Sequence, residues 1–276
     1  MKGKMSNAWN FPGSRWWKFD FHTHTPASYD YGLGDDSFMN ITPEKWLQKA
    51  MQSGIDCVAV TDHNTGAWID RLKAKNLELR GQEIRPDWYR ELAIFPGIEI
   101  TVTDSGTQVH LLAIFDPDTD GREIARVLGL CGITSGYGSS WEAATKTSFA
   151  ETVEKIIEAN GIAIPAHIDG PQGLLYRISN LTPSLAESLE KVFAAEFTDP
   201  GSFVNADPSL KKIVERFARV SSSDAHKPHE TGRHYSWIKM STPSIEGLRH
   251  ALQDHASCVK NQHENPGHFP DVFSRN

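Results

Sequence analysis

The segment KFDFHTHT, residues 18–25, combines a short alternating pattern with three side chains that can bind metal ions. Apolar and polar residues alternate over residues 18–23, which predicts a strand. Alternate residues of a strand lie on the same face, so Asp20, His22 and His24 are expected to point the same way. An H-x-H sequence after an apolar strand recurs in metal hydrolases. The segment therefore predicts a strand that ends in a cluster of metal-binding groups.

Short apolar segments alternate with amphipathic segments along the rest of the chain. Residues 57–61 (CVAVT) are typical of a strand covered on both faces. Thr42 and Pro43 mark the start of a helix that Gly54 ends. Further strands are expected at 93–95, 98–102, 109–115, 162–165, 194–197, 219–222 and 237–240. Further helices are expected at 67–79, 121–130, 148–160, 183–190, 208–218 and 243–252, and long loops at 131–147, 169–182 and 199–207. This alternation predicts an α/β protein with a largely parallel sheet, closed into a barrel.

Composition limits the classes of protein that the chain can represent. The 276 residues include 28 Lys and Arg and 35 Asp and Glu, so the net charge is 28 − 35 = −7. This balance argues against a broad nucleic-acid groove, although not against a small basic pocket. Three distant cysteines form neither a disulfide framework nor a zinc ribbon, which fits a reducing cytoplasm. The sequence shows no signal-peptide pattern and no apolar run that predicts a membrane span.

The expected domain organisation is simple. Residues 1–17 are expected to form an N-terminal arm, and residues 259–276 a polar C-terminal tail. Between them, residues 18–258 are expected to form one domain.

Histidines and acids occupy the ends of several predicted strands. In an α/β barrel, functional groups lie where strands run into the following loops. Neutral imidazoles with carboxylates suit divalent zinc, manganese or iron. The residues in such positions are Asp20, His22, His24, Asp62, His63, Glu99, His110, His167, Asp224 and His226.

These motifs resemble the PHP family, the polymerase and histidinol phosphatase superfamily of metal-dependent phosphoesterases. The motifs are DFHTHT (20–25), TDH (61–63), PGIE (96–99), His110, PAH (165–167) and SDAH (223–226). The resemblance extends over about residues 18–252. It implies a distorted (β/α)7 barrel of the PHP type with two or three divalent metal ions.

The resemblance also implies a set of ligands. The first metal would be held by His22, His24, Glu99 and Asp224, and the second by His63, His226 and Asp30. Glu99 would bridge, and His110 and His167 would hold a third ion. Asp20 and Asp62 would orient imidazole rings, and Asp62 is counted among the catalytic residues for that reason.

Two further segments, TPASYDYG (25–32) and GRHYSWIKM (232–240), resemble one subgroup of the family. Its members include free-standing phosphoesterases and PHP modules that precede an ATPase domain. The chain has no P-loop pattern, so any ATPase is expected to be a separate chain or absent.

The expected reaction is hydrolysis of a phosphate ester by a metal-bound hydroxide. Lys227 and Arg233 follow the last motif and are candidates for binding the phosphate, as is Arg177 in a long loop. His229 and His234 are candidates for protonating the leaving oxygen.

Four functions stay open at this point. The preferred substrate is a phosphomonoester of a small metabolite or nucleotide. A phosphodiesterase or nuclease acting on a nucleic-acid end is the alternative, followed by a non-catalytic metal-stabilised module and an amidohydrolase-type enzyme. Four aromatic residues lie where a base could stack, although sealing the barrel surface is the more common role of such side chains: Trp68, Trp88, Trp141 and Tyr137.

Overall fold

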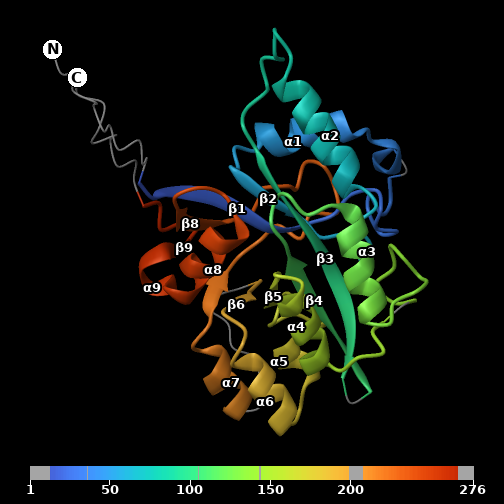
Figure 1. The fold of residues 1–276 in the computed structure, drawn as a ribbon, viewed down its shortest axis with the longest axis vertical. Helices are drawn as coiled ribbons and strands as arrows, with labels where there is room; N and C mark the ends of the chain where they lie inside the picture. Colours follow the sequence, from blue (N-terminus) through green and yellow to red (C-terminus); the bar gives the residue numbers. More distant parts are fainter. Residues whose placement is uncertain (1–12, 36, 105, 143, 199–207, 267–276) are drawn as a thin grey trace, which may run out of the picture.

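The computed structural model describes residues 13–35, 37–104, 106–142, 144–198 and 208–266. Its main sheet has seven strands in the order β5-β4-β3-β2-β1-β8-β9. The sheet curls around the centre of the molecule (Figure 1). Its strands are β1 (Arg15–Thr23), β2 (Cys57–Val60), β3 (Ala93–Asp104), β4 (Thr107–Ile114), β5 (Ile162–Pro165), β8 (Ser236–Met240) and β9 (Val259–Asn261).

The prediction of a largely parallel sheet is wrong. Only β1, β2 and β3 pair in parallel within the main sheet, whereas β3–β4, β4–β5, β1–β8 and β8–β9 are antiparallel. The reason lies in the connection between β3 and β4, which is two residues long. A parallel crossover needs a dozen or more residues, so this link can form only a hairpin. The strands predicted at 93–95 and 98–102 are one continuous strand.

A complete seven-stranded barrel is not confirmed. Strands β6 (Ala194–Glu196) and β7 (Ala218–Val220) pair in parallel as a separate two-stranded sheet. The backbone N–H of Ile168, after β5, donates to the Glu196 carbonyl at 2.7 Å. A single bridge joins Thr23 of β1 to Ala225, which follows β7. The architecture is therefore an α/β fold built on a curled half-barrel, with β6 and β7 lying near its open side.

Helices cover the outside of the sheet (Figure 1). In α1, the Thr42 side chain accepts a hydrogen bond from the Lys45 N–H, and Pro43 is the first helical residue, as the sequence predicts. The helices are α1 (Pro43–Gln52), α2 (Ile69–Arg80), α3 (Gly121–Leu130), α4 (Phe149–Glu158), α5 (Leu174–Arg177), α6 (Pro183–Leu189), α7 (Pro208–Val214), α8 (Ile245–Gln253) and α9 (His255–Cys258), with a short 3-10 helix η1 (Phe38–Asn40). None of these described helices is long and apolar enough to cross a membrane.

Two segments differ from the expected organisation near the chain ends. Strand β1 begins at Arg15, inside the predicted arm, because Arg15 and Trp16 pair with Met240 and Lys239 of β8. Strand β9 begins at Val259, inside the predicted tail, and pairs with the other edge of β8. Residues 1–12 of the predicted arm and 267–276 of the predicted tail lie outside the described residues. The whole loop predicted at 199–207 lies outside them as well.

Two apolar clusters lie on the faces of the main sheet. One packs residues of α1 to α4, such as Leu47, Leu72 and Ile156, against the sheet. The other packs Phe19 and Phe95 with residues of α8. Because the strands are held firmly from both faces, the side chains at their ends are presented from a rigid frame.

Candidate metal centre

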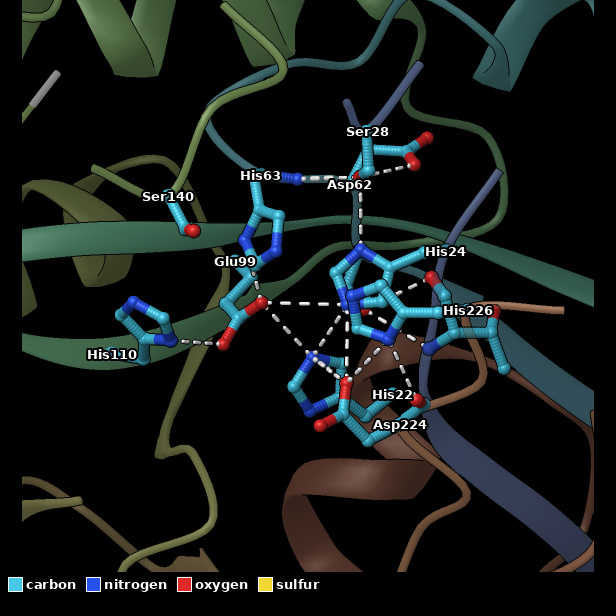
Figure 2. A network of polar contacts seen from close by, with 12 residues as sticks. His22, His24, Ser28, Asp62, His63, Glu99, His110, Ser140, Asp224 and His226 are labelled. Atoms are coloured by element: carbon cyan, nitrogen blue, oxygen red, sulfur yellow. Dashed lines mark hydrogen bonds and ion pairs between the residues drawn. The ribbon is translucent and has the colours of Figure 1, made fainter. Parts of the chain in front are cut away.

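The nine side chains predicted as metal ligands converge at one end of the sheet. They come from β1, β3 and β4 and from the segments that follow β1, β2, β5 and β7 (Figure 2). Glu99 lies at the middle of the group, on β3. The backbones of Glu99 and His63 form an isolated parallel β-bridge. The converging residues are His22, His24, Asp30, His63, Glu99, His110, His167, Asp224 and His226.

The first group contains two imidazoles and two carboxylates. The Nε2 atom of His22 lies 3.1 Å from Glu99 Oε2 and 3.3 Å from Asp224 Oδ1. The Nε2 atom of His24 lies 3.4 Å from the same Glu99 oxygen and 3.2 Å from the same Asp224 oxygen. The two Nε2 atoms are themselves 3.1 Å apart. Four donor atoms therefore surround one point.

The second group is centred on Asp30. Its Oδ2 atom lies 3.1 Å from His63 Nε2, and its Oδ1 atom lies 3.4 Å from His226 Nε2. Nitrogen atoms of His24, His63 and His226 lie within 4.8 Å of one another. Asp30 reaches this group from the loop after β1, which places it beside the two histidines that the sequence motifs supply.

The third group uses the other oxygen of Glu99. Its Oε1 atom lies 2.6 Å from His110 Nδ1 and 3.1 Å from His167 Nε2. Its Oε2 atom faces His22, His24 and also His63 Nδ1, at 2.8 Å. Glu99 thus presents one oxygen to each side, which is the arrangement of a bridging carboxylate.

Divalent cations fit these groups. Four buried atoms in them lie close to one another or to a site imidazole but form no well-aligned hydrogen bond, namely Asp30 Oδ1, His63 Nδ1, Glu99 Oε2 and Asp224 Oδ1. Buried polar atoms are costly when they are unpaired, so an additional partner is expected at this point. Ligands about 2.1 Å from a shared ion lie roughly 3.0–3.4 Å apart, which matches the separations in the first group. The mixed nitrogen and oxygen donors suit zinc, manganese or iron.

The charges of these groups are strongly coupled. Burial alone would raise the pKa of Glu99, but His110, His22 and His63 hold it well below its usual range. Burial, together with His226 and His63, lowers the pKa of His24 to about 3, so its ring is neutral. Burial disfavours charge on His63 as well, but Glu99 and Asp30 raise its pKa to about 10. A carboxylate at the centre is therefore ionised and able to bind cations.

Ser28 fixes the ring of His24. The Asp62 carboxylate accepts hydrogen bonds from Ser28 Oγ, at 2.8 Å, and from the backbone and hydroxyl of Thr25. Since the Ser28 hydrogen points to Asp62, the Ser28 oxygen is free to accept from His24 Nδ1, 2.9 Å away. This arrangement leaves a lone pair on His24 Nε2, directed at the metal centre. Asp62 thus contacts the His24 ring only through Ser28.

Asp20 has a different set of partners from the one expected. It is fully buried and accepts hydrogen bonds from Ser223 Oγ at 2.6 Å and from the Gly232 N–H at 2.8 Å. It also contacts the backbone N–H of His22 at 3.4 Å. Burial raises its pKa to about 6 despite these bonds. Asp20 holds together the backbone segments that carry ligands, and none of its described contacts is to an imidazole ring.

Glu196 is a site residue that the sequence analysis missed. It is buried at the end of β6, and its Oε2 atom lies 2.9 Å from His22 Nδ1. The same oxygen accepts a hydrogen bond from the His167 backbone N–H at 2.9 Å. The sequence offered a signal for it, because Glu196 is an acid in the strand predicted at 194–197. Glu99 was selected because it too is an acid in a predicted strand.

Two of the converging residues adopt backbone conformations that are uncommon for residues other than glycine. Asp224 has a φ of 47° and His167 a φ of 25°. Such conformations cost roughly 1–3 kcal/mol and persist where the surrounding structure over-determines them. Their location at the ends of β7 and β5 indicates that this strain serves the placement of the site residues.

The candidate substrate-binding residues lie in two loops at the edge of the centre. Hydrogen bonds from Ser37 lower the pKa of Asp35, and the half-buried Lys227 nearby lowers it a little further. Arg233 and His234 are exposed on the loop before β8. The Arg177 guanidinium is bound to the Pro171 carbonyl at 2.6 Å and to Gln172 Oε1 at 2.7 Å, so it supports its own loop.

A cavity of about 450 Å³ lies between two segments that lead away from donor residues, and none of the nine donors lines it. One wall is the segment that follows Asp30, and another includes Pro228 and His229, two and three residues after His226. Lys45 and Lys49 line it from the exposed face of α1. The His229 ring packs near Phe38, with their ring centres 5.8 Å apart. The sequence analysis placed His229 near the substrate but missed the two lysines, whose spacing of four residues places them on one helix face.

Comparisons with known proteins show what this fold resembles. No family model and no curated protein matches the chain. Among solved structures, the lesion-specific endonuclease PfuEndoQ from Pyrococcus furiosus matches 90% of this chain and 58% of its own, with a TM-score of 0.62 and 19% identity. Endonuclease Q bound to a 27-mer duplex with an abasic lesion matches the same shares, with a TM-score of 0.61 and 18% identity.

A third structure carries the family name. It is a two-domain protein from Bacteroides vulgatus that contains a predicted PHP-like metal-dependent phosphoesterase, with a TM-score of 0.58 and 14% identity over 90% of this chain and 66% of its own. These likenesses confirm, at the level of the fold, the resemblance to PHP-type phosphoesterases. The chain spans less than two thirds of the length of either endonuclease chain. No ATPase is among these three structures, so a separate ATPase partner is without support.

Proposed function

We propose that this protein is a metal-dependent phosphoesterase. The observation that carries the proposal is the placement of Glu99, whose two oxygens face separate groups of imidazole and carboxylate donors. Two or three divalent ions bound there would supply Lewis-acid charge and an activated water molecule for hydrolysis. A structural metal site is usually closed by four ligands and uses cysteine, whereas two of these three groups share the Glu99 carboxylate and none of the three contains cysteine.

The surrounding residues support this chemistry. Ser28 and Glu196 each contact the Nδ1 atom of a site histidine, so they leave the Nε2 atom of His24 and of His22 directed to the centre. No side-chain nucleophile is proposed. A full set of donors is retained, which supports a catalytic protein over a module that metals only stabilise. The central acid is Glu99, whereas the amidohydrolase-type alternative expects a bridging lysine.

A phosphate ester also needs cationic groups that attract it to the site. Lys45 and Lys49 line the cavity, and Lys227 follows His226 in the sequence, so these lysines would attract a phosphate by charge. His229 lines the same cavity, so it is the better placed of the two candidates for protonating a leaving oxygen. We propose a phosphomonoester as the first candidate substrate.

The second candidate is an ester in a nucleic-acid end. The specific observation in its favour is the likeness in fold to endonuclease Q, one structure of which holds DNA. The net charge of −7 argues against a long duplex track, but a short single strand needs only a few cationic contacts.

The test is an assay with metal content measured on the same samples. Metal-free protein would be reloaded with manganese, zinc or iron and given an aryl phosphomonoester, the matching diester and a short single-stranded oligonucleotide. Metal-dependent hydrolysis of the monoester would support the first candidate, and preference for the diester or oligonucleotide would support the second. Protein that binds no metal after reloading would contradict both.

A further inference from the structure

Four aromatic side chains stand out by their exposure. Among the residues that the structure describes, the tyrosines and tryptophans exposed by more than a third are Tyr29 (56%), Tyr137 (45%), Trp141 (60%) and Tyr176 (58%). The other aromatic candidates behave as sealing residues, because Trp68 is buried and Trp88 is half-buried against the core. An exposed aromatic residue by itself is ordinary. The location of all four is what carries the inference.

Tyr29 and Tyr137 lie on two loops that are joined beside the metal centre. Tyr29 directly precedes Asp30 of the second group. Its backbone N–H donates to the Gly138 carbonyl at 2.8 Å, and the Gly138 N–H donates to the His63 carbonyl at 2.8 Å. The loop that carries Tyr137 is therefore held between a site histidine and the segment that presents Asp30.

Trp141 lies on the same loop as Tyr137, and further hydrogen bonds hold this loop to residues next to His63 and His110. Asn64, the residue after His63, donates from its side chain to the Ser139 carbonyl at 2.8 Å. The Thr101 hydroxyl donates to the Ser140 carbonyl at 3.1 Å, and Thr101 is the register partner of His110. Figure 2 shows Ser140 in view with Glu99 and His110. Trp141 is the next residue along this anchored loop.

Tyr176 completes the set on the side of the third group. It lies in α5, next to Arg177, whose guanidinium binds the loop at Pro171 and Gln172. The Gln172 carbonyl accepts a hydrogen bond from the His110 backbone N–H at 3.2 Å. All four exposed aromatic residues are therefore on segments bonded to site residues or adjacent to them in sequence.

We propose that Tyr29, Tyr137, Trp141 and Tyr176 form an aromatic rim that stacks unpaired nucleobases of the substrate. This inference rests on the proposed function, and it assigns the substrate class as a phosphate ester that carries a nucleobase. Aromatic side chains next to a site for phosphate offer a flat, sequence-tolerant surface for bases. Bases in a duplex are already stacked on one another, so the rim fits a nucleotide or a single-stranded end.

The test measures binding without turnover. Metal-free protein, kept in a chelator, would be titrated with a labelled thymidine hexamer and with a hexamer of abasic nucleotides that has the same phosphates. The comparison isolates the bases because the charge of the two probes is equal. The variants are Trp141→Ala and Tyr176→Ala, with Ile84→Ala as the control, since Ile84 is 88% exposed and lies on none of the anchored loops. Thermal unfolding of each variant would confirm that it folds.

The wild type is expected to bind the thymidine hexamer at least about fivefold more tightly than the abasic hexamer, the effect of one stacked base. Trp141→Ala or Tyr176→Ala is expected to reduce this preference, and Ile84→Ala to keep it. Equal binding of the two hexamers by the wild type would overturn the rim, as would a preference that neither aromatic variant reduces. Competition by thymidine 5′-monophosphate would identify a nucleotide as the source of the base, and competition by oligonucleotides alone would identify a strand end.

This design separates the two proposals. A preference for bases in a protein that hydrolyses no ester would support the rim and contradict the phosphoesterase function. Hydrolysis of simple esters without any preference for bases would support the function and overturn the rim.

Discussion

The Nδ1 atom of His22 lies 2.9 Å from Oε2 of Glu196, and both side chains are buried. The same carboxylate oxygen accepts a hydrogen bond from the backbone N–H of His167. One acid in the small sheet therefore holds a ring of the first group and the backbone of the third. This contact also connects β6 to the end of β1, across the side where the main sheet does not close.

Glu196→Ala is expected to weaken metal binding. Without the carboxylate, His22 loses the partner that fixes its ring and tautomer, and loss of such a partner typically lowers metal affinity by about 10- to 100-fold. The measurement is a titration of metal against a competing chelator. The control is Glu190→Ala, which removes an exposed acid paired with Arg216 on the surface. Equal affinities for the two variants would show that Glu196 has no positioning role.

Ser28→Ala is expected to reduce both metal affinity and stability. It leaves His24 Nδ1 without its described partner and deprives Asp62 of one bond, and an unsatisfied buried group costs about 1–3 kcal/mol. Chemical denaturation and the chelator titration would measure the two effects.

The matched control for Ser28 is Ser188→Ala. Ser188 is also buried and donates a hydrogen bond to the Leu185 carbonyl in α6. The Ser188→Ala substitution should lower the free energy of unfolding without changing metal affinity. If Ser28→Ala behaved in the same way, the proposed link from Asp62 to His24 would have no function.

Gly138→Ala is expected to displace the loop that carries Tyr137 and Trp141. Gly138 has a φ of +88°, and an added Cβ would lie 2.4 Å from the Ala27 carbonyl oxygen. The loop would have to move away from Tyr29, which should weaken binding of the thymidine hexamer. The control is Gly129→Ala in α3, where a Cβ meets nothing within 4 Å and alanine should stabilise the helix by about 1 kcal/mol. Unchanged hexamer binding by Gly138→Ala would contradict the role given to this loop.

Metal binding is expected to release protons. In the metal-free protein, neighbouring carboxylates outweigh burial and raise the pKa of His22, His63 and His226, that of His63 to about 10. Below that pH the rings hold protons that must leave before the nitrogen atoms bind a cation. Metal affinity should therefore rise as pH increases from neutrality. Calorimetry in two buffers of different ionisation enthalpy would measure the release, and identical heats in both buffers would contradict it.

The sequence predicts the site better than the sheet that carries it. His22, Glu99 and Asp224 are far apart along the chain, yet they converge. His22 and Asp224 follow the rule that functional groups lie where strands end, whereas Glu99 lies within the long strand β3. Glu196 also lies at the end of a predicted strand, but the sequence analysis did not select it. No motif surrounds this acid to distinguish it from an ordinary surface acid.

The closure of the barrel could not be predicted from apolar runs alone. Such runs locate strands but carry no information on whether neighbours run parallel or antiparallel. The two-residue connection before Thr107 was the available signal for the β3–β4 hairpin. The exposure of Trp141 and the position of Lys45 on the cavity wall depend on how loops and helices are packed, which no local pattern specifies.

The central claim is that Glu99 holds together a catalytic cluster of metal ions. The most direct measurement is the number of divalent ions bound per chain, with hydrolysis of an aryl phosphate ester followed on the same samples, for the wild type and for Glu99→Ala. The control is Glu187→Ala, which removes an exposed acid on α6.

The account predicts two or three ions and turnover in the wild type and in Glu187→Ala. In Glu99→Ala it predicts fewer ions and hydrolysis slower by about a hundredfold or more. The first and third groups lose a ligand, and His63 loses the carboxylate beside its Nδ1 atom, so less positive charge would stabilise the transition state. A Glu99→Ala protein that keeps the full number of ions and the full rate would contradict the account.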